Sequence, residues 1–326
     1  MYAFIHYIRT VATILITNSH YSNVWPIEDL AMGGLLGNIL FFAASGFCLF
    51  NVKGNFGEWY LKRFLRVYPV MIAFTLLTVL FGAYSLSSWQ DALALFVFPT
   101  NYIFLVWLMV LYAAFYLIAW LAKKYENCIE LALGIIVAAW LIVYFAFVDK
   151  SVYGIDDVSK PFILFLYFSA MLMGALFKKR VEEFKQFKGI NVVWLLVSLV
   201  VYFGSKIAFS KVAAISFWQI ANQISILFVL YFIFVVFIGL EEQLKKLPNW
   251  LNKTIEFFAS ITLHIYLVQF VVIRLLENLV FPLNFVATTA AILAAASALY
   301  FAEYFIRKGI SHLTKKGKDK HAESNG

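Results

Sequence analysis

Long apolar stretches separated by short polar loops repeat along almost the whole chain of 326 residues. A bilayer core about 30 Å thick takes about 20 residues of α-helix to cross, so each stretch of that length predicts a membrane span. The pattern therefore predicts an all-α polytopic membrane protein with about ten transmembrane helices. The predicted spans are residues 3–21, 33–51, 67–86, 101–122, 129–148, 161–177, 190–208, 217–240, 257–276 and 284–306. The apolar segment 88–100 is too short to cross, and it predicts an interfacial or re-entrant piece.

The composition agrees with a membrane protein of a single domain. The chain is 63% hydrophobic and 13% charged, whereas a soluble domain is about half apolar and about a quarter charged. The first apolar stretch carries Arg9, and no small-residue cleavage site follows it, which predicts a retained helix rather than a signal peptide. We expect one integral-membrane domain over residues 1–310. Residues 311–326 are polar and lack apolar anchors, so they predict a disordered, basic cytoplasmic tail.

The basic residues fall mainly on alternate loops. Because cytoplasmic loops of membrane proteins carry an excess of Lys and Arg, this asymmetry predicts that both termini are cytoplasmic. The predicted cytoplasmic set is Lys53, Lys62, Arg63, Arg66, Lys123, Lys124, Lys178, Lys179, Arg180, Lys185, Lys188, Lys245, Lys246, Lys253, Arg307, Lys308, Lys315, Lys316, Lys318 and Lys320. Only Lys150, Lys160, Lys206 and Lys211 fall on the outer loops. The asymmetry also explains most of the net charge of +8, so we expect no nucleic-acid partner.

Two ionisable residues, Arg9 and His20, lie at the ends of the first predicted span. An α-helix turns about 100° and rises about 1.5 Å per residue, so the two lie on one face, about 16 Å apart. Thr13 and Thr17 fall near the same face, and the four residues form a polar stripe on an apolar helix. Ionisable residues in a span usually face a bundle interior or a wet cavity. The alternative is that Arg9 reaches the cytoplasmic headgroups and His20 lies at the outer interface.

Other polar residues suggest both functional and structural roles. Arg63 and Arg66 are three residues apart at the start of the third predicted span, and arginine binds phosphate through paired hydrogen bonds. Composition alone favours the alternative, that they are ordinary cytoplasmic anchors beside Lys62. Ser45 and Gly46 predict a close approach of two helices. A nucleophilic Ser45 is less favoured, because no G-x-S-x-G turn surrounds it.

Several polar residues fall within later spans. We expect His264 to be hydrogen-bonded inside the bundle, with a smaller chance of site involvement, and Glu303 to pair with a cytoplasmic arginine. Asn222, Gln223 and Gln269 can hydrogen-bond a substrate or join helices. No cluster of His, Cys and carboxylates has metal-ligand spacing, so no metal site is expected.

Five motifs, taken in order, resemble the acyltransferase-3 family of membrane O-acyltransferases. They are R-x10-H in the first span, FFAASGF at residues 41–47, RFLR at 63–66, IYLVQF at 265–270 and AEYFIRK at 302–308. The predicted ten spans with both termini inside are also similar. The chain departs from the family at Tyr7, where many members have Asp, and at Gln269, where many have His. These departures concern the substrate subclass more than the family.

The resemblance implies an activity and a set of site residues. Similar proteins move an acyl group, often acetyl, from cytoplasmic acyl-CoA to a hydroxyl of a cell-surface polysaccharide or glycan precursor. His20 would then be the catalytic base, since a histidine can remove the hydroxyl proton. Arg63 and Arg66, with Ser45 nearby, would bind the acyl-CoA, and Arg9 would contact its pantetheine or pyrophosphate or brace the bundle. The implied location is the plasma membrane, in particular the inner membrane of a bacterium.

A transporter or flippase of a lipid-linked sugar is the main alternative. Ten spans suit a transporter, but such proteins often show paired repeats and helices broken by Gly or Pro. This chain shows no clear repeat and has six prolines, which makes the alternative weaker. A non-catalytic scaffold would leave the polar stripe of Arg9 and His20 unexplained.

Overall fold

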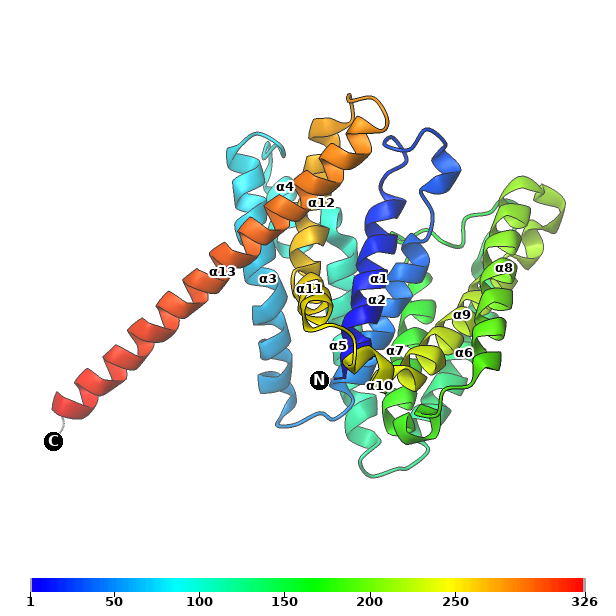
Figure 1. Ribbon diagram of the computed structural model, residues 1–326, viewed down its shortest axis with the longest axis horizontal. Helices are drawn as coiled ribbons and strands as arrows, with labels where there is room; N and C mark the ends of the chain where they lie inside the picture. Colours follow the sequence, from blue (N-terminus) through cyan, green and yellow to red (C-terminus); the bar gives the residue numbers. More distant parts are fainter. Residues whose placement is uncertain (1, 325–326) are drawn as a thin grey trace.

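The protein folds as a bundle of α-helices in the computed structural model (Figure 1). The structure describes the backbone of residues 2–324 and the side chains of residues 2–99 and 101–309. Within these limits the chain forms helices and turns and contains no strand. The long helices are α1 (Ala3–Ser19), α2 (Gly34–Leu49), α3 (Phe56–Leu80), α5 (Ile103–Leu121), α6 (Cys128–Phe147), α7 (Ile163–Lys179), α8 (Gly189–Lys211), α9 (Ile220–Gly239), α11 (Asn249–Ser260), α12 (Thr262–Leu276) and α13 (Leu283–Ser324).

Seven helices in the described part of the chain are long and apolar enough to cross a membrane. The number rises to eight if α11 and α12, which meet at a bend of 65°, count as one broken span. The all-helical membrane fold is therefore confirmed. Each of the ten predicted stretches overlaps a helix, but α1 and α7 have only 17 residues each. The count of ten and the cytoplasmic position of the termini stay predictions.

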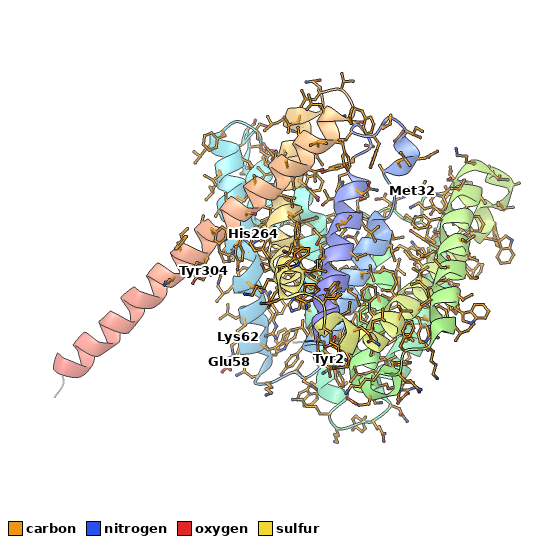
Figure 2. All side chains as sticks on the ribbon, in the orientation of Figure 1. Tyr2, Met32, Glu58, Lys62, His264 and Tyr304 are labelled. Carbon is orange, nitrogen blue, oxygen red and sulfur yellow. The ribbon has the colours of Figure 1, made fainter. Side chains whose placement is uncertain are left out.

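Several lysines gather at the end of the bundle that holds the N-terminus. We call it the basic end and define it by Lys62, Lys124, Lys178, Lys179 and Lys245. Figure 1 shows the α2–α3 and α5–α6 connections at this end, and the α1–α2 and α12–α13 connections at the opposite end. In Figure 2, Tyr2 and Lys62 mark the basic end, Met32 lies at the opposite end, and His264 lies between them. α13 passes α3 and then extends away from the other helices (Figure 1). The structure continues this helix through the predicted tail to Ser324, and the division of the chain at residue 310 stays a prediction.

The helix α1 lies inside the bundle and contacts α2, α9, α10, α11 and α12. Phe4, Ile8 and Ala12 are four residues apart and fully buried in the main core, which gives α1 one apolar face. The opposite side carries Thr10 and Thr13, which are also buried. Thr10 donates a hydrogen bond to the carbonyl of Ile255 in α11 over 3.3 Å. One face of α1 therefore packs in the apolar core, and the opposite face makes polar contacts with neighbouring helices.

A carboxylate from a remote helix holds the N-terminus of α1. Glu241, in the short helix α10 (Glu241–Lys245), accepts hydrogen bonds from the backbone amides of Ala3 and Phe4 over 3.0 and 2.8 Å. The first amides of a helix have no partner within the helix, and the helix dipole favours a negative charge there. Glu241 is 5% exposed and also pairs with Lys245. It therefore fixes the position of α1 along its axis.

Two glycines bring α2 and α7 into backbone contact. A Cβ atom added to Gly46 would lie closer than 3.0 Å to the carbonyl oxygen of Met171, and one added to Gly174 would lie as close to the carbonyl oxygen of Ala43. Each glycine thus packs on the backbone of the facing helix. The predicted close approach at Ser45 and Gly46 is confirmed, and α7 is the partner.

A buried polar network holds the α6–α7 loop against α8 and α9. Asp156 accepts hydrogen bonds from Tyr153 (2.5 Å), Lys206 (3.0 Å) and Gln223 (3.2 Å). Asn222 donates to the carbonyl of Tyr202 in α8 over 2.8 Å. Of the two roles predicted for Asn222 and Gln223, the structure shows the one that joins segments of the protein.

Candidate active site

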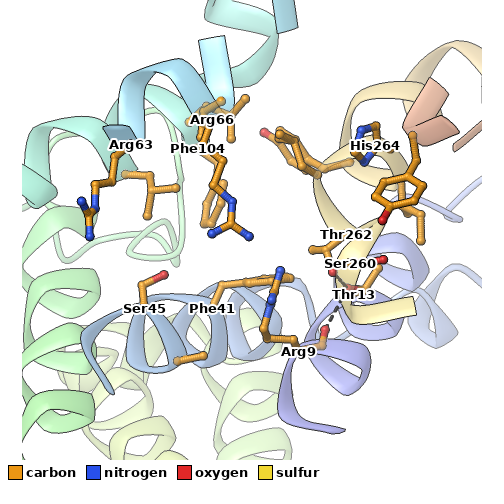
Figure 3. Close-up of a pocket in the computed structure, with 18 of the residues that line it drawn as sticks. Arg9, Thr13, Phe41, Ser45, Arg63, Arg66, Phe104, Ser260, Thr262 and His264 are labelled. Carbon is orange, nitrogen blue, oxygen red and sulfur yellow. Dashed lines mark hydrogen bonds between the residues drawn. The ribbon is translucent and has the colours of Figure 1, made fainter. Parts of the chain in front are cut away.

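A cavity of about 810 Å³ lies between α1, α2, α3, α5, α12 and α13, with lining residues from α11 (Figure 3). This volume is typical of a site for a small molecule or cofactor. The basic side chains along it are His6, Arg9, Lys62, Arg63, Arg66, His264 and Arg307. Phe41, Phe104 and Tyr266 are among its apolar and aromatic lining residues. The cavity thus combines an apolar wall with many cationic groups.

Arg9 and Arg66 point toward one another across the cavity from α1 and α3 (Figure 3). Two acidic residues, Glu256 and Glu303, line the same cavity, and the carboxylate of Glu303 is already paired with Arg307 and His264. No carboxylate in the described part of the chain lies within salt-bridge distance of Arg9 or Arg66. Two uncompensated guanidinium groups that face each other repel, and an anion between them would relieve the repulsion.

Arg63 also lines the cavity but is held differently. Its guanidinium lies 4.2 Å from the centre of the Trp59 ring and donates to the Trp59 carbonyl over 2.8 Å. Both contacts are one turn back on α3, so the side chain rests on its own helix. Arg63 and Arg66 therefore share the cavity, but only Arg66 approaches Arg9.

A chain of hydrogen bonds closes the side of the cavity between α12, α13 and α3. Nε2 of His264 lies 2.8 Å from Glu303, the other oxygen of Glu303 accepts from Arg307 over 2.5 Å, and Arg307 donates to the carbonyl of Leu65 over 2.9 Å. The predicted pairing of Glu303 with a basic-end arginine is confirmed. The sequence carries a signal for it, because Glu303 and Arg307 have the i, i+4 spacing of helix ion pairs. His264 is hydrogen-bonded inside the bundle as expected, and it also lines the cavity.

The far end of the cavity is lined by hydroxyl and amide groups. The Thr13 hydroxyl lies 3.2 Å from that of Thr262, and Thr17 donates to Oε1 of Gln269 over 3.0 Å. Thr17 is eight residues beyond Arg9, so the cavity follows α1 for about 12 Å. The predicted face of Arg9, Thr13 and Thr17 therefore lines one continuous wall.

His20 does not line this cavity. It caps the C-terminal end of α1, three residues beyond Thr17, and its ring packs on Phe270 with 4.6 Å between the ring centres. Phe270 directly follows Gln269 in α12. The structure therefore gathers Arg9, Ser45, Arg63 and Arg66 in one cavity and places His20 just beyond its far end.

The family comparison identifies the class of protein that carries this cavity. A sequence model of an acyltransferase domain, Acyl_transf_3, matches residues 2–305. The chain belongs to the acyltransferase-3 family. Comparisons with curated proteins and with solved structures gave no significant match. Membership makes the chain a multi-pass membrane acyltransferase, and its substrates are a separate question.

The chemistry available in the cavity is acid–base and electrostatic. The described residues hold no group of three or more His, Cys, Asp or Glu side chains that could bind a metal ion. The guanidinium groups of Arg9 and Arg66 can bind an anion at one end of the cavity. The hydroxyl and amide groups at the far end can bind a neutral polar ligand. This division suits a long substrate with a charged head and a polar, uncharged tip.

Proposed function

We propose that this protein is a membrane O-acyltransferase. It takes an acyl group, in the first instance acetyl, from cytoplasmic acyl-CoA and transfers it to a hydroxyl of a cell-surface polysaccharide or glycan precursor. The observation that carries the proposal is the placement of Arg9 and Arg66 without acidic partners in one cavity of an acyltransferase-3 chain. The protein would lie in the plasma membrane, with the basic end toward the cytoplasm.

The donor fits the cavity by charge and by direction. The phosphates of CoA would lie at the basic end, where Arg9, Arg66 and Arg63 can bind them. The pantetheine arm would run along α1, past Thr13 and toward Thr17. Arg9 and Thr17 are about 12 Å apart along the axis, so the thioester would reach the far end beside His20.

The acceptor would approach His20 from the outer side of the bundle. His20 removes the proton of the sugar hydroxyl as its oxygen bonds to the acyl carbon. The carbon–sulfur bond breaks, and the proton held by His20 passes to the departing CoA sulfur. This sequence is direct transfer. An acyl-histidine formed first at His20 is the other route, and it would appear as a covalent mass increase on the protein.

The proposal is tested in proteoliposomes that hold the purified full chain, an acyl-CoA with a labelled acyl group, and glycans from cells that lack the protein. We expect labelled glycan with the wild-type protein and none with His20→Ala at equal membrane abundance. Mass spectrometry of surface glycans with and without the protein identifies the acyl group and the acceptor. Glycan movement without acyl transfer would instead indicate a transporter or flippase.

The donor site is tested separately by acyl-CoA binding. Arg66→Ala removes a charge-assisted hydrogen bond worth about 1.5–3 kcal/mol, so Kd should rise about 10- to 100-fold. Lys123→Ala is the matched control, because Lys123 is a basic residue that does not line the cavity. Equal affinities for the Arg66 and Lys123 variants would remove Arg66 from the donor site.

A further inference from the structure

The far end of the cavity holds a buried amide with an unused donor. Gln269 is 0% exposed and lines the cavity from α12. Its Oε1 accepts the hydrogen bond from Thr17, while its Nε2 is buried and has no hydrogen-bond partner in the described structure. We infer that Gln269 is a catalytic residue whose Nε2 donates to the carbonyl oxygen of the transferred acyl group.

The hydrogen bond from Thr17 uses only one end of the Gln269 amide. The hydroxyl donates to Oε1, and Nε2 is left as the polar atom without a partner. A buried donor without a partner costs about 1–3 kcal/mol. Ten buried side-chain atoms of the described residues have no partner, and three of them, in His6, His264 and Gln269, belong to residues that line the cavity. A ligand or water that completes the hydrogen bond explains such a group. The acyl carbonyl would complete this one.

The position of Gln269 is right for this role. It lies at the end of the cavity away from Arg9 and Arg66, so a donor bound by its phosphates would bring its thioester, not its charged head, to Nε2. Gln269 also precedes Phe270, on which the His20 ring packs. Consecutive residues of α12 therefore line the cavity and contact the proposed base.

The chemistry requires such a donor. When the sugar oxygen attacks the thioester, negative charge develops on the carbonyl oxygen before the carbon–sulfur bond breaks. A fixed donor in a site that excludes water stabilises this charge more than it stabilises the neutral carbonyl. The inference rests on the proposed acyl transfer and adds the group that stabilises its oxyanion.

The test compares three variants of the full chain in proteoliposomes. Gln269→Met keeps the size of the side chain and removes the donor, so kcat should fall about 10²- to 10³-fold. The Kd for acyl-CoA should stay within about threefold of wild type, because Arg9, Arg63 and Arg66 supply the proposed affinity for its phosphates. Gln269→His restores an N–H donor and should recover most of the loss in kcat.

Thr10→Val separates catalysis from helix packing. Thr10 also joins α1 to a neighbouring helix by a hydrogen bond, to the carbonyl of Ile255, but it does not line the cavity. We expect kcat for Thr10→Val to stay within about threefold of wild type. Equal losses in the Thr10→Val and Gln269→Met variants, no recovery in Gln269→His, or a normal kcat for Gln269→Met would overturn the inference. A wild-type protein that transfers no acyl group would instead refute the proposed function, so the two failures are distinguishable.

Discussion

The contact between α2 and α7 gives the sharpest stability prediction. Gly46→Ala places a methyl group closer than 3.0 Å to the carbonyl oxygen of Met171, a distance that Cβ atoms essentially never show. The neighbour is backbone, so it cannot rotate away, and the two helices must move apart. Overpacking of this kind costs about 1–3 kcal/mol and sometimes more.

A matched control separates this steric cost from helix propensity. Gly204 lies inside α8, and a Cβ atom added there meets no atom within 4 Å. Alanine is favoured over glycine in a helix by about 1 kcal/mol, so Gly204→Ala should leave stability unchanged or raise it. The propensity gain applies to both variants, so they should differ by the steric cost alone, about 1–3 kcal/mol.

Thermal unfolding in detergent measures this difference. A gap of about 2 kcal/mol corresponds to about 3 °C in Tm for a chain of 326 residues. Gly174→Ala should resemble Gly46→Ala, because its Cβ would meet the carbonyl oxygen of Ala43 in the same contact. If Gly46→Ala and Gly204→Ala unfold at the same temperature, α2 and α7 are not in backbone contact.

Three further predictions concern the ends of the bundle. Glu241→Gln replaces the charged cap of α1 by a neutral one and should lower the free energy of unfolding by about 1 kcal/mol. Chemical denaturation measures this value, and an unchanged result would contradict the capping role. Lys206→Met leaves Asp156 in a largely buried site without its cation and should cost about 1–2 kcal/mol, and Asp156→Asn in the same chain should recover part of the loss; no recovery would contradict the pairing. Hydrogen bonds from Ser159 hold the pKa of Asp157 below its usual value, so the loop is stabilised at neutral pH and loses this contribution as the pH falls below about 4. The protection of the Ser159 amide from hydrogen exchange, relative to its intrinsic rate at each pH, should therefore fall in acid, and an Asp157→Asn variant with the same acid response would refute the assignment.

The helices and their polar faces could be predicted from the sequence because both depend on local periodicity. The apolar stretches located the helices, and the spacing of Arg9, Thr13 and Thr17 placed them on one face, which lines the cavity. The break between α11 and α12 was not predicted, and residues 257–276 were expected as one span. Ser260 and Thr262 donate hydrogen bonds to backbone carbonyls of the preceding turn, and such bonds favour a bend.

The extent of the cavity depends on tertiary packing, which one sequence does not contain. The helical repeat puts His20 on the same face as Arg9, but the cavity ends at Thr17 and Gln269. The ring of Phe270, from a helix some 250 residues later, covers His20 instead. The free donor of Gln269 likewise depends on the Thr17 hydroxyl, and nothing in the spacing of these two residues predicts their contact.

The cap of α1 has a consequence for the order in which the protein is assembled. The helix α1 is made before α10, because its stabilising carboxylate on Glu241 follows Ala3 by 238 residues. Segments of a chain fold in the order in which they emerge, so α1 must wait for this cap until α10 is synthesised. Insertion of α1 and its fixation along its axis are thus separate events, and Arg9 reaches its final height only after α10 has formed.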